Sequence, residues 1–342
     1  MPSGPNIAIV GATGAVGQEF LAVLAQRRFP IGNLSVLASA RSKGRTVRFG
    51  DEQLDIQELK EDSFRSVDLA LFSAGGSVSR QYAPIASDAG CTVVDNSSAF
   101  RMSDGVPLVV PEVNPQALQG HGAGKGGIIA NPNCSTIIML VPVSPLLHAA
   151  GGARRIVVST YQAASGAGAR GMAELEQQTR QVLDGEPPTC AFFPQPYAFN
   201  LFSHNSELGP DGYNTEELKM VQESHKIWVD DSVSITATCV RVPILRAHAE
   251  SIHLELLEPF SEDEARRVLS EAPGVKVLDD RAKNRFPTPL DATGQDAVFV
   301  GRIRNDLGRG TTGQTGLNLF VCGDQLRKGA ALNAVQIAEL LI

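Results

Sequence analysis

The chain has 342 residues, 43% of them hydrophobic, and its 30 basic and 37 acidic side chains give a formal net charge of −7. This length is more than twice the commonest domain size, so about two domains are expected. The negative balance, without a long run of one sign, argues against a general nucleic-acid or membrane-surface binder.

The cysteines favour a reducing compartment. Their number is odd and no CxxC pair occurs, a pattern typical of free thiols, so a cytoplasmic protein is predicted. The first residues, MPSGPNIAIVG, have neither the basic nor the apolar region of a secretory signal. The uncharged stretch 126–153 is interrupted by asparagines, serines and prolines, so no membrane span is predicted.

The N-terminal half alternates short β-branched runs with helical patterns, which predicts a parallel sheet with crossover helices. Strands are expected at 6–10, 34–38, 67–72 and 91–96, and helices at 16–26 and 78–89.

After about residue 155 the runs are longer and alternate with period two, which predicts an antiparallel or mixed sheet in a second domain. The expected strands are 155–162, 233–242, 251–257, 297–304 and 317–322. The Gly-rich segment 120–127 reads as a surface connection, and the last residues, 328–342, follow a helical period.

A glycine-rich turn, GATGAVG at 11–17, lies where the first strand meets the first helix. In that context glycines permit a tight turn, and the helix N-terminus offers N–H groups to a pyrophosphate. The spacing is GxxGxxG and not the commoner GxGxxG, and a helix start that merely needs room is the alternative. We predict a dinucleotide site here.

Residues 39–48, which follow the second strand, contain four basic side chains and no acidic one. An NAD site is expected to carry Asp or Glu in this region, to hold the ribose 2′-hydroxyl. The basic stretch favours NADP instead, and an ordinary basic surface loop is the alternative.

Cys134 lies in the motif NPNCST (131–136), just before an apolar helical run. A helix start stabilises a thiolate, and nearby backbone N–H groups can serve an oxyanion. The other possibility is a small buried hydrophobe. An acid/base partner must come from six histidines, none with metal-ligand spacing, so no metal site is predicted. His248, at the start of a strand, is one candidate of the six.

Several motifs together resemble the aspartate-semialdehyde dehydrogenase family, in order and over nearly the whole chain. They are GATGAVG (11–17), DNSSAFRM (95–102), VVPEVN (109–114), NPNCST (131–136), YQAASGAG (161–168), ELKMVQESHKI (217–227), CVRVP (239–243) with His248 shortly after it, and GDQLRKGAA (323–331).

The resemblance implies NADPH-dependent reductive dephosphorylation of L-aspartyl 4-phosphate to L-aspartate 4-semialdehyde and phosphate, on the route to lysine (through diaminopimelate), methionine, threonine and isoleucine. It implies a homodimer and an α/β fold: a Rossmann-like NADP-binding domain, 1–132 completed by a helix at 325–342, and an α+β catalytic and dimerisation domain, 133–324.

The resemblance also implies roles for individual residues. Cys134 is similar to the nucleophile, His248 to the proton donor and acceptor, and Gln162 to the residue that orients the substrate. Arg241 and Glu216 are similar to the residues that hold the substrate's carboxylate and amino groups. The phosphate-binding residues of the family resemble Arg101, Lys219 and Asn133. The NADP contacts correspond to Gly11, Thr13, Gly14, Ala15, Val16, Arg41, Ser42, Ser165, Gly166 and Gln325.

Three alternatives remain at this point. The alternative to phosphate binding is that Arg101 and Lys219 are ordinary solvated surface charges. Lys219 would then pair with Glu223 along a helix that Asn214 and Glu217 cap. N-acetyl-γ-glutamyl-phosphate reductase shares the Cys/His chemistry, but its acetylated substrate has no need of a carboxylate such as Glu216. A non-catalytic relative would lack the nucleophile or the histidine, and this chain has both.

Overall fold

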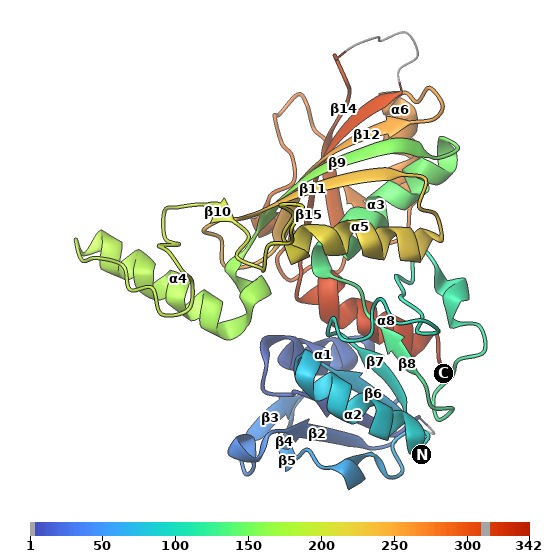
Figure 1. Ribbon diagram of the computed structural model, residues 1–342, viewed down its shortest axis with the longest axis vertical. Coiled ribbons are helices and arrows are strands. Elements are labelled where there is room, and N and C mark those ends of the chain that lie inside the picture. Colours follow the sequence, from blue (N-terminus) through green and yellow to red (C-terminus); the bar gives the residue numbers. More distant parts are fainter. Residues whose placement is uncertain (1–3, 309–314) are drawn as a thin grey trace. The chain divides into compact units, whose positions relative to one another are not determined.

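The computed structural model describes residues 4–308 and 315–342; residues 1–3, part of the segment tested for a secretory signal, lie outside the described residues. The chain divides into two compact units (Figure 1). Unit 1 comprises residues 1–133 and 330–342, and unit 2 comprises residues 134–329. Each unit is described by itself.

Unit 1 contains a parallel six-stranded sheet with the order β5-β2-β1-β6-β7-β8. The strands are β1 (Ile7–Val10), β2 (Leu34–Ala38), β5 (Gln57–Glu58), β6 (Leu69–Phe72), β7 (Thr92–Asp95) and β8 (Ile128–Ala130), with a separate hairpin of β3 (Thr46–Phe49) and β4 (Glu52–Asp55). Strand β1 pairs with β2 on one side and β6 on the other. The predicted parallel sheet is confirmed, and β1 is its topological switch point.

Helices cover both faces of this sheet, and the alternate residues of β1 therefore belong to two different cores. Ile7 and Ile9 pack in one core with α1 (Ala15–Arg27) and α8 (Leu332–Glu339), whereas Ala8 and Val10 pack in the other with α2 (Gly76–Asp88). Helix α8 begins after a π-helical turn, Arg327–Ala331. The strands are therefore buried on both faces, as their continuous apolar runs predict.

Unit 2 contains a seven-stranded mixed sheet with the order β10-β11-β9-β12-β15-β14-β13. The strands are β9 (Ala153–Gln162), β10 (Phe202–Ser203), β11 (Ser234–Arg241), β12 (His248–Leu256), β13 (Val275–Val277), β14 (Val298–Asn305) and β15 (Gly316–Gly323). Strand β9 is parallel to β11 and antiparallel to β12. The mixed sheet was one of the two predicted forms.

The helices of unit 2 are α3 (Cys134–Ala149), α4 (Gly168–Leu183), α5 (Thr215–Trp228), α6 (Glu262–Glu271) and α7 (Pro289–Ala292). Helix α3 is apolar on nearly every side and packs against α5, α6 and the central strands. Helix α5 begins with the predicted capping box of Asn214 and Glu217. Within the described residues, no helix is long and apolar enough to cross a membrane.

Candidate active site

Cys134 is the first residue of α3, so its thiol lies at a helix N-terminus, where the dipole favours a thiolate. It is partly exposed, unlike the buried Cys91, Cys239 and Cys322. Burial raises the pKa of Cys91 to about 12 and that of Cys239 and Cys322 still further. These three thiols are therefore poor nucleophiles at neutral pH.

Gln162 is the last residue of β9, and its buried side chain connects two helix starts. Its Nε2 donates to Ser135 Oγ, beside Cys134, and to Glu216 Oε1 near the start of α5, both at 3.0 Å. Its Oε1 is buried and has no hydrogen-bond partner within the described chain. That atom remains available to a donor on a bound molecule.

His248 is the first residue of β12 and is fully buried. Its Nδ1 accepts a hydrogen bond from the Ala163 N–H at 3.0 Å, so in the neutral ring the proton belongs on Nε2. Burial, then the positive charge of Arg241, lowers the pKa of His248 to about 3. The ring is therefore neutral at pH 7, and Nε2 has no partner among the described residues.

Arg241 ends β11 directly beside Gln162, its register partner on β9. It is buried, and its Nε donates to Asn205 Oδ1 at 3.2 Å. Burial lowers the pKa of Arg241, while Glu216 and Cys134 are among the groups that raise it, so these side chains share one electrostatic environment.

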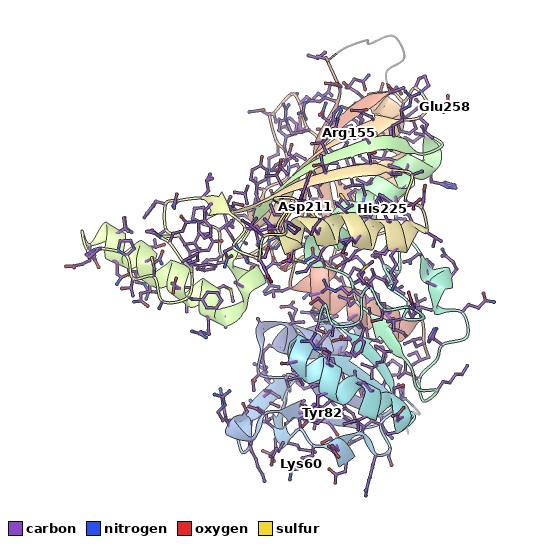
Figure 2. The ribbon with its side chains drawn as sticks, in the orientation of Figure 1. Lys60, Tyr82, Arg155, Asp211, His225 and Glu258 are labelled. Carbon is purple, nitrogen blue, oxygen red and sulfur yellow. The ribbon has the colours of Figure 1, made fainter. Side chains whose placement is uncertain are left out.

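Lys219 does not form the exposed pair with Glu223 that the helical spacing allows. Its Nζ pairs with Glu216 Oε2 at 3.0 Å, and Glu223 is only 1% exposed. Figure 2 labels Asp211, in the turn before α5, and His225 in its last turn; Glu216 and Lys219 belong to the Asp211 end of this helix. A carboxylate and an ammonium group therefore lie together beside Gln162.

Three predicted cofactor residues of unit 2 lie near His248. Gln325 donates from Nε2 to Ser165 Oγ, and its Oε1 accepts the N–H of Ala247 at 2.9 Å. Gly166 lies against the imidazole ring of His248. Both polar side chains, Ser165 and Gln325, are thus engaged with unit 2 itself.

The glycine turn of unit 1 follows β1 at the carboxyl edge of the sheet. Gly11 has a φ of 90°, and a Cβ on Gly17 would collide with the Gly11 carbonyl oxygen, so both positions require glycine. Thr13 and Gly14 are exposed; Ala15 and Val16 begin α1, whose first turn has no side-chain cap and no acidic residue. The N-terminal N–H groups are therefore free of side-chain competition, which fits a phosphate group.

The remaining predicted residues of unit 1 have different surroundings. Arg41 is exposed and Ser42 buried in a 3₁₀ turn that follows β2, the neighbour of β1. Arg101 is no solvated surface charge: it is buried and donates to the carbonyl oxygens of Asn131 and Asn96, at 2.9 and 3.0 Å. Asn133 is buried and directly precedes Cys134.

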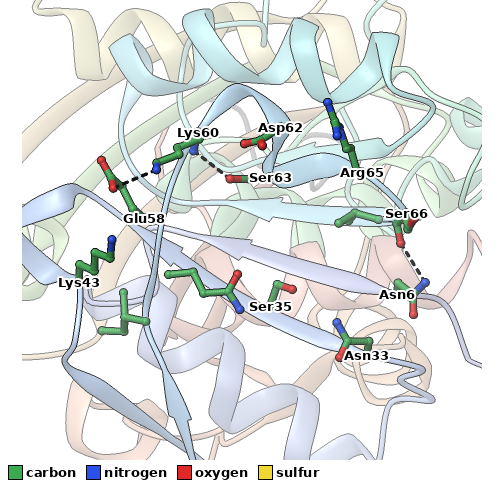
Figure 3. Close-up of a pocket in the computed structure, with 13 residues that line it drawn as sticks. Asn6, Asn33, Ser35, Lys43, Glu58, Lys60, Asp62, Ser63, Arg65 and Ser66 are labelled. Carbon is green, nitrogen blue, oxygen red and sulfur yellow. Dashed lines mark hydrogen bonds and ion pairs between the residues drawn. The ribbon is translucent and has the colours of Figure 1, made fainter.

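A hollow of about 550 Å³ in unit 1 has a mostly polar lining (Figure 3). Asn6, Asn33 and Ser66, which line it, precede strands β1, β2 and β6. Lys43, Gln57 and Glu58 also line it, so the hollow runs along the β2–β5 edge of the sheet toward the carboxyl end of β2. None of its lining residues is a predicted cofactor contact.

The sequence did not identify Ser135 or Asn205 as site residues. Ser135 was within a singled-out motif, but nothing in the sequence indicated that Asn205 contacts Arg241. Among the described residues, no cluster of His, Cys, Asp and Glu could hold a metal ion.

Two family models match the chain. The semialdehyde dehydrogenase NAD binding domain matches residues 6–121, and the semialdehyde dehydrogenase dimerisation domain matches residues 143–328.

Curated relatives match the chain over nearly its full length. The aspartate-semialdehyde dehydrogenase of Synechocystis sp. is 54% identical over 100% of this chain and 98% of its own. That of Legionella pneumophila is 51% identical, with 98% and 95% covered. The crystal structure of aspartate semialdehyde dehydrogenase II from Vibrio cholerae, complexed with ASA, has a TM-score of 0.93 and 45% identity, with 99% and 98% covered.

These relatives favour the dehydrogenase over the acetylglutamyl-phosphate reductase and over a non-catalytic relative. With the match over its whole length, the chain belongs to the aspartate-semialdehyde dehydrogenase family and is an oxidoreductase.

Proposed function

We propose that the chain reduces L-aspartyl 4-phosphate to L-aspartate 4-semialdehyde, with release of phosphate and with NADPH as the reductant. The observation that carries the proposal is the row of Arg241, Gln162 and His248 at the ends of three neighbouring strands, beside the helix start that bears Cys134.

Cys134 is the proposed nucleophile. Its thiolate, favoured by the start of α3 and by the nearby Arg241 charge, attacks the acyl carbon, the carbon–oxygen bond to phosphate breaks, and a thioester forms. His248 presents Nε2–H as the donor to the oxygen that becomes negative in the tetrahedral intermediate. To accept a proton on Nε2 the ring must first change tautomer and release Ala163, so the geometry supports the donor role more directly.

Charge complementarity assigns the substrate's other groups. Arg241 suits the α-carboxylate, because its planar fork can bind both oxygens, and Glu216 suits the α-ammonium group. Gln162 joins this part of the site to Ser135 and so orients the substrate toward Cys134. Lys219, Arg101 and Asn133 are the proposed phosphate-binding residues.

A nicotinamide cofactor supplies the hydride that reduces the thioester. The uncapped start of α1 fits its pyrophosphate, and the exposed Arg41 after β2 favours the 2′-phosphate of NADP over NAD. Ser165, Gly166 and Gln325 are the proposed contacts of unit 2 with the cofactor. The proposed domains are 1–132 with 325–342 for NADP, and 133–324 for catalysis and dimerisation; the compact units differ from them in that residues 325–329 belong to unit 2 and residue 133 to unit 1.

Two further proposals rest on the comparisons. The dimerisation-domain match supports a homodimer. The ASA in the Vibrio cholerae structure supports a small-molecule substrate here. A cytoplasmic location is proposed from the cysteine pattern.

The test is an assay of the reverse reaction in which the formation of NADPH is measured. We expect turnover with aspartate semialdehyde, NADP and phosphate, and none when phosphate is omitted. N-acetylglutamate semialdehyde is the control substrate; preference for it would contradict the proposal.

A further inference from the structure

Helix α4 and the loop that follows it lie beside β10 in unit 2 (Figure 1). The loop is proline-rich, and one carboxylate holds the backbone of its residues 191–193. Glu174, 7% exposed on α4, accepts the N–H groups of Ala191, Phe192 and Phe193 at 2.5–3.0 Å. Three charge-assisted hydrogen bonds to consecutive residues leave this segment little freedom.

Gln178, one helical turn beyond Glu174, fixes the second half of the loop. Its Oε1 accepts the N–H groups of Tyr197 and Ala198 at 2.7 and 3.1 Å, and its Nε2 donates to the Thr189 carbonyl at 2.9 Å. Two buried polar side chains of α4 thus hold the backbone of the loop in place through hydrogen bonds.

The loop carries an aromatic cluster to the substrate-binding end of the sheet. The rings of Phe193 and Tyr197 pack edge to face with centroids 4.7 Å apart. Tyr197 Oη donates to the backbone carbonyl of Gln162 at 3.2 Å, and Arg241 Cζ lies 5.8 Å from the centroid of Phe193. The cluster therefore contacts two neighbours in the row of proposed site residues.

The polar contacts of Arg241 are few. Its buried side chain donates from Nε to Asn205 Oδ1, and it forms no ion pair with any residue that the structure describes. A long guanidinium side chain loses rotamer freedom when it binds a ligand, unless its surroundings already hold it in place. Phe193 supplies an aromatic face for this purpose.

We propose that Phe193, held in place by Glu174, is a positioning residue that orients Arg241 for the α-carboxylate of the substrate. The inference rests on the proposed function, in which Arg241 binds that carboxylate. It adds that selectivity for a carboxylate-bearing aldehyde depends on α4 and its loop, which contribute no group to the chemical step.

The main test compares neighbours in the same loop. Phe193→Leu removes the ring under Arg241, whereas Phe192→Leu removes the neighbouring ring, which contacts Arg170 and packs edge to face on Phe193. We expect F193L to lower kcat/KM for aspartate semialdehyde about three- to thirtyfold, the range of a cation–π contact, through a higher KM. The kcat and the KM for phosphate should stay within about twofold of those of F192L.

The second comparison uses the same helix. Glu174→Gln places an amide donor against the loop's N–H groups, whereas Glu176→Gln changes an exposed residue that pairs only loosely with Arg180, at 3.7 Å. We expect E174Q to reproduce the KM effect of F193L, and E176Q to have wild-type kinetics. Should F193L fail to fold, Phe193→Met fills the site without a ring.

A double mutant separates the possible failures. In the Arg241→Lys background, Phe193→Leu should cost less than about twofold, because the group that it positions has gone. An equal loss in both backgrounds would overturn the inference, as would wild-type KM values for F193L and E174Q. Wild-type kcat/KM for R241K alone would instead overturn the proposed role of Arg241.

Discussion

Gly166 lies directly against the ring of His248: a Cβ at position 166 would be 3.2 Å from both Cε1 and Nε2, and 3.5 Å from Arg241 Nη1. We expect Gly166→Ala to move the imidazole by a few tenths of an ångström and to lower kcat about tenfold, since small displacements of reacting groups are costly. Steady-state kinetics together with thermal unfolding will separate this from instability. Unchanged turnover would show that Nε2 does not need its present position.

Cys134→Ser should keep the fold and cofactor binding and lose turnover by on the order of a thousandfold or more, because an alkoxide is much harder to form than a thiolate. Turnover and binding of NADP are the two measurements. Cys190→Ser, which changes the exposed cysteine of the loop, is the control. Substantial residual activity in C134S would remove Cys134 from the mechanism.

Arg41→Ala should raise the KM for NADP about tenfold and leave the KM for NAD nearly unchanged, because the variant cannot form the charge-assisted hydrogen bond to the 2′-phosphate. Arg48→Ala is the matched control, since Arg48 bonds to the Gly50 carbonyl in the β3–β4 hairpin. Equal increases for both cofactors would show that Arg41 has another role.

Glu250 is fully buried, and neither carboxyl oxygen has a partner within the described chain; burial raises its pKa well above the ordinary 4.5. At a pH between the ordinary pKa of about 4.5, which applies to the unfolded chain, and the raised pKa of the folded protein, only the folded protein keeps this proton. The free energy of unfolding therefore falls as the pH rises above about 4.5. Glu250→Gln should therefore gain stability over wild type, by up to about 1.4 kcal/mol for each pH unit.

Unfolding of both proteins by denaturant at several pH values will measure this difference. Glu255→Gln, on the same strand but only half buried, is the control. A constant difference between E250Q and wild type from acid to neutral pH would mean that the pKa of Glu250 is the same in the folded and the unfolded protein.

The longer strands of both sheets were predictable, because β-branched runs with clear boundaries predict strands whether or not their packing partners are known. The prediction of 34–38 coincides with β2, and that of 155–162 lies within β9. The short strands β5, β8, β10 and β13 were not predicted, since two or three residues carry no periodicity, and the β3–β4 hairpin was not predicted either.

Helix α4 was also missed, for a different reason. Glu174 and Gln178 lie on its buried side, where they bind the backbone of the next loop, so the inward face has no purely apolar stripe. The proline-rich loop likewise had no interpretation until its partner was known.

Some residues of the candidate site could likewise be predicted from the sequence, and others could not. Cys134 could be proposed from its place at a helix start, whereas the adjacency of Arg241 and Gln162 depends on β11 returning beside β9, which no local pattern specifies. Lys219 pairs with Glu216 because Glu223 faces the interior, and helical spacing alone could not decide between them.

Unit 2 is one continuous segment, 134–329, that interrupts the chain of unit 1. Its two ends are neighbours, since a Cβ on Gly329 would lie 2.9 Å from the Cβ of Cys134. Adjacent ends are the geometry that lets one domain be inserted into a loop of another. The segment is therefore suited to exchange as a cassette with that of a relative, with the nucleophile carried at its first residue.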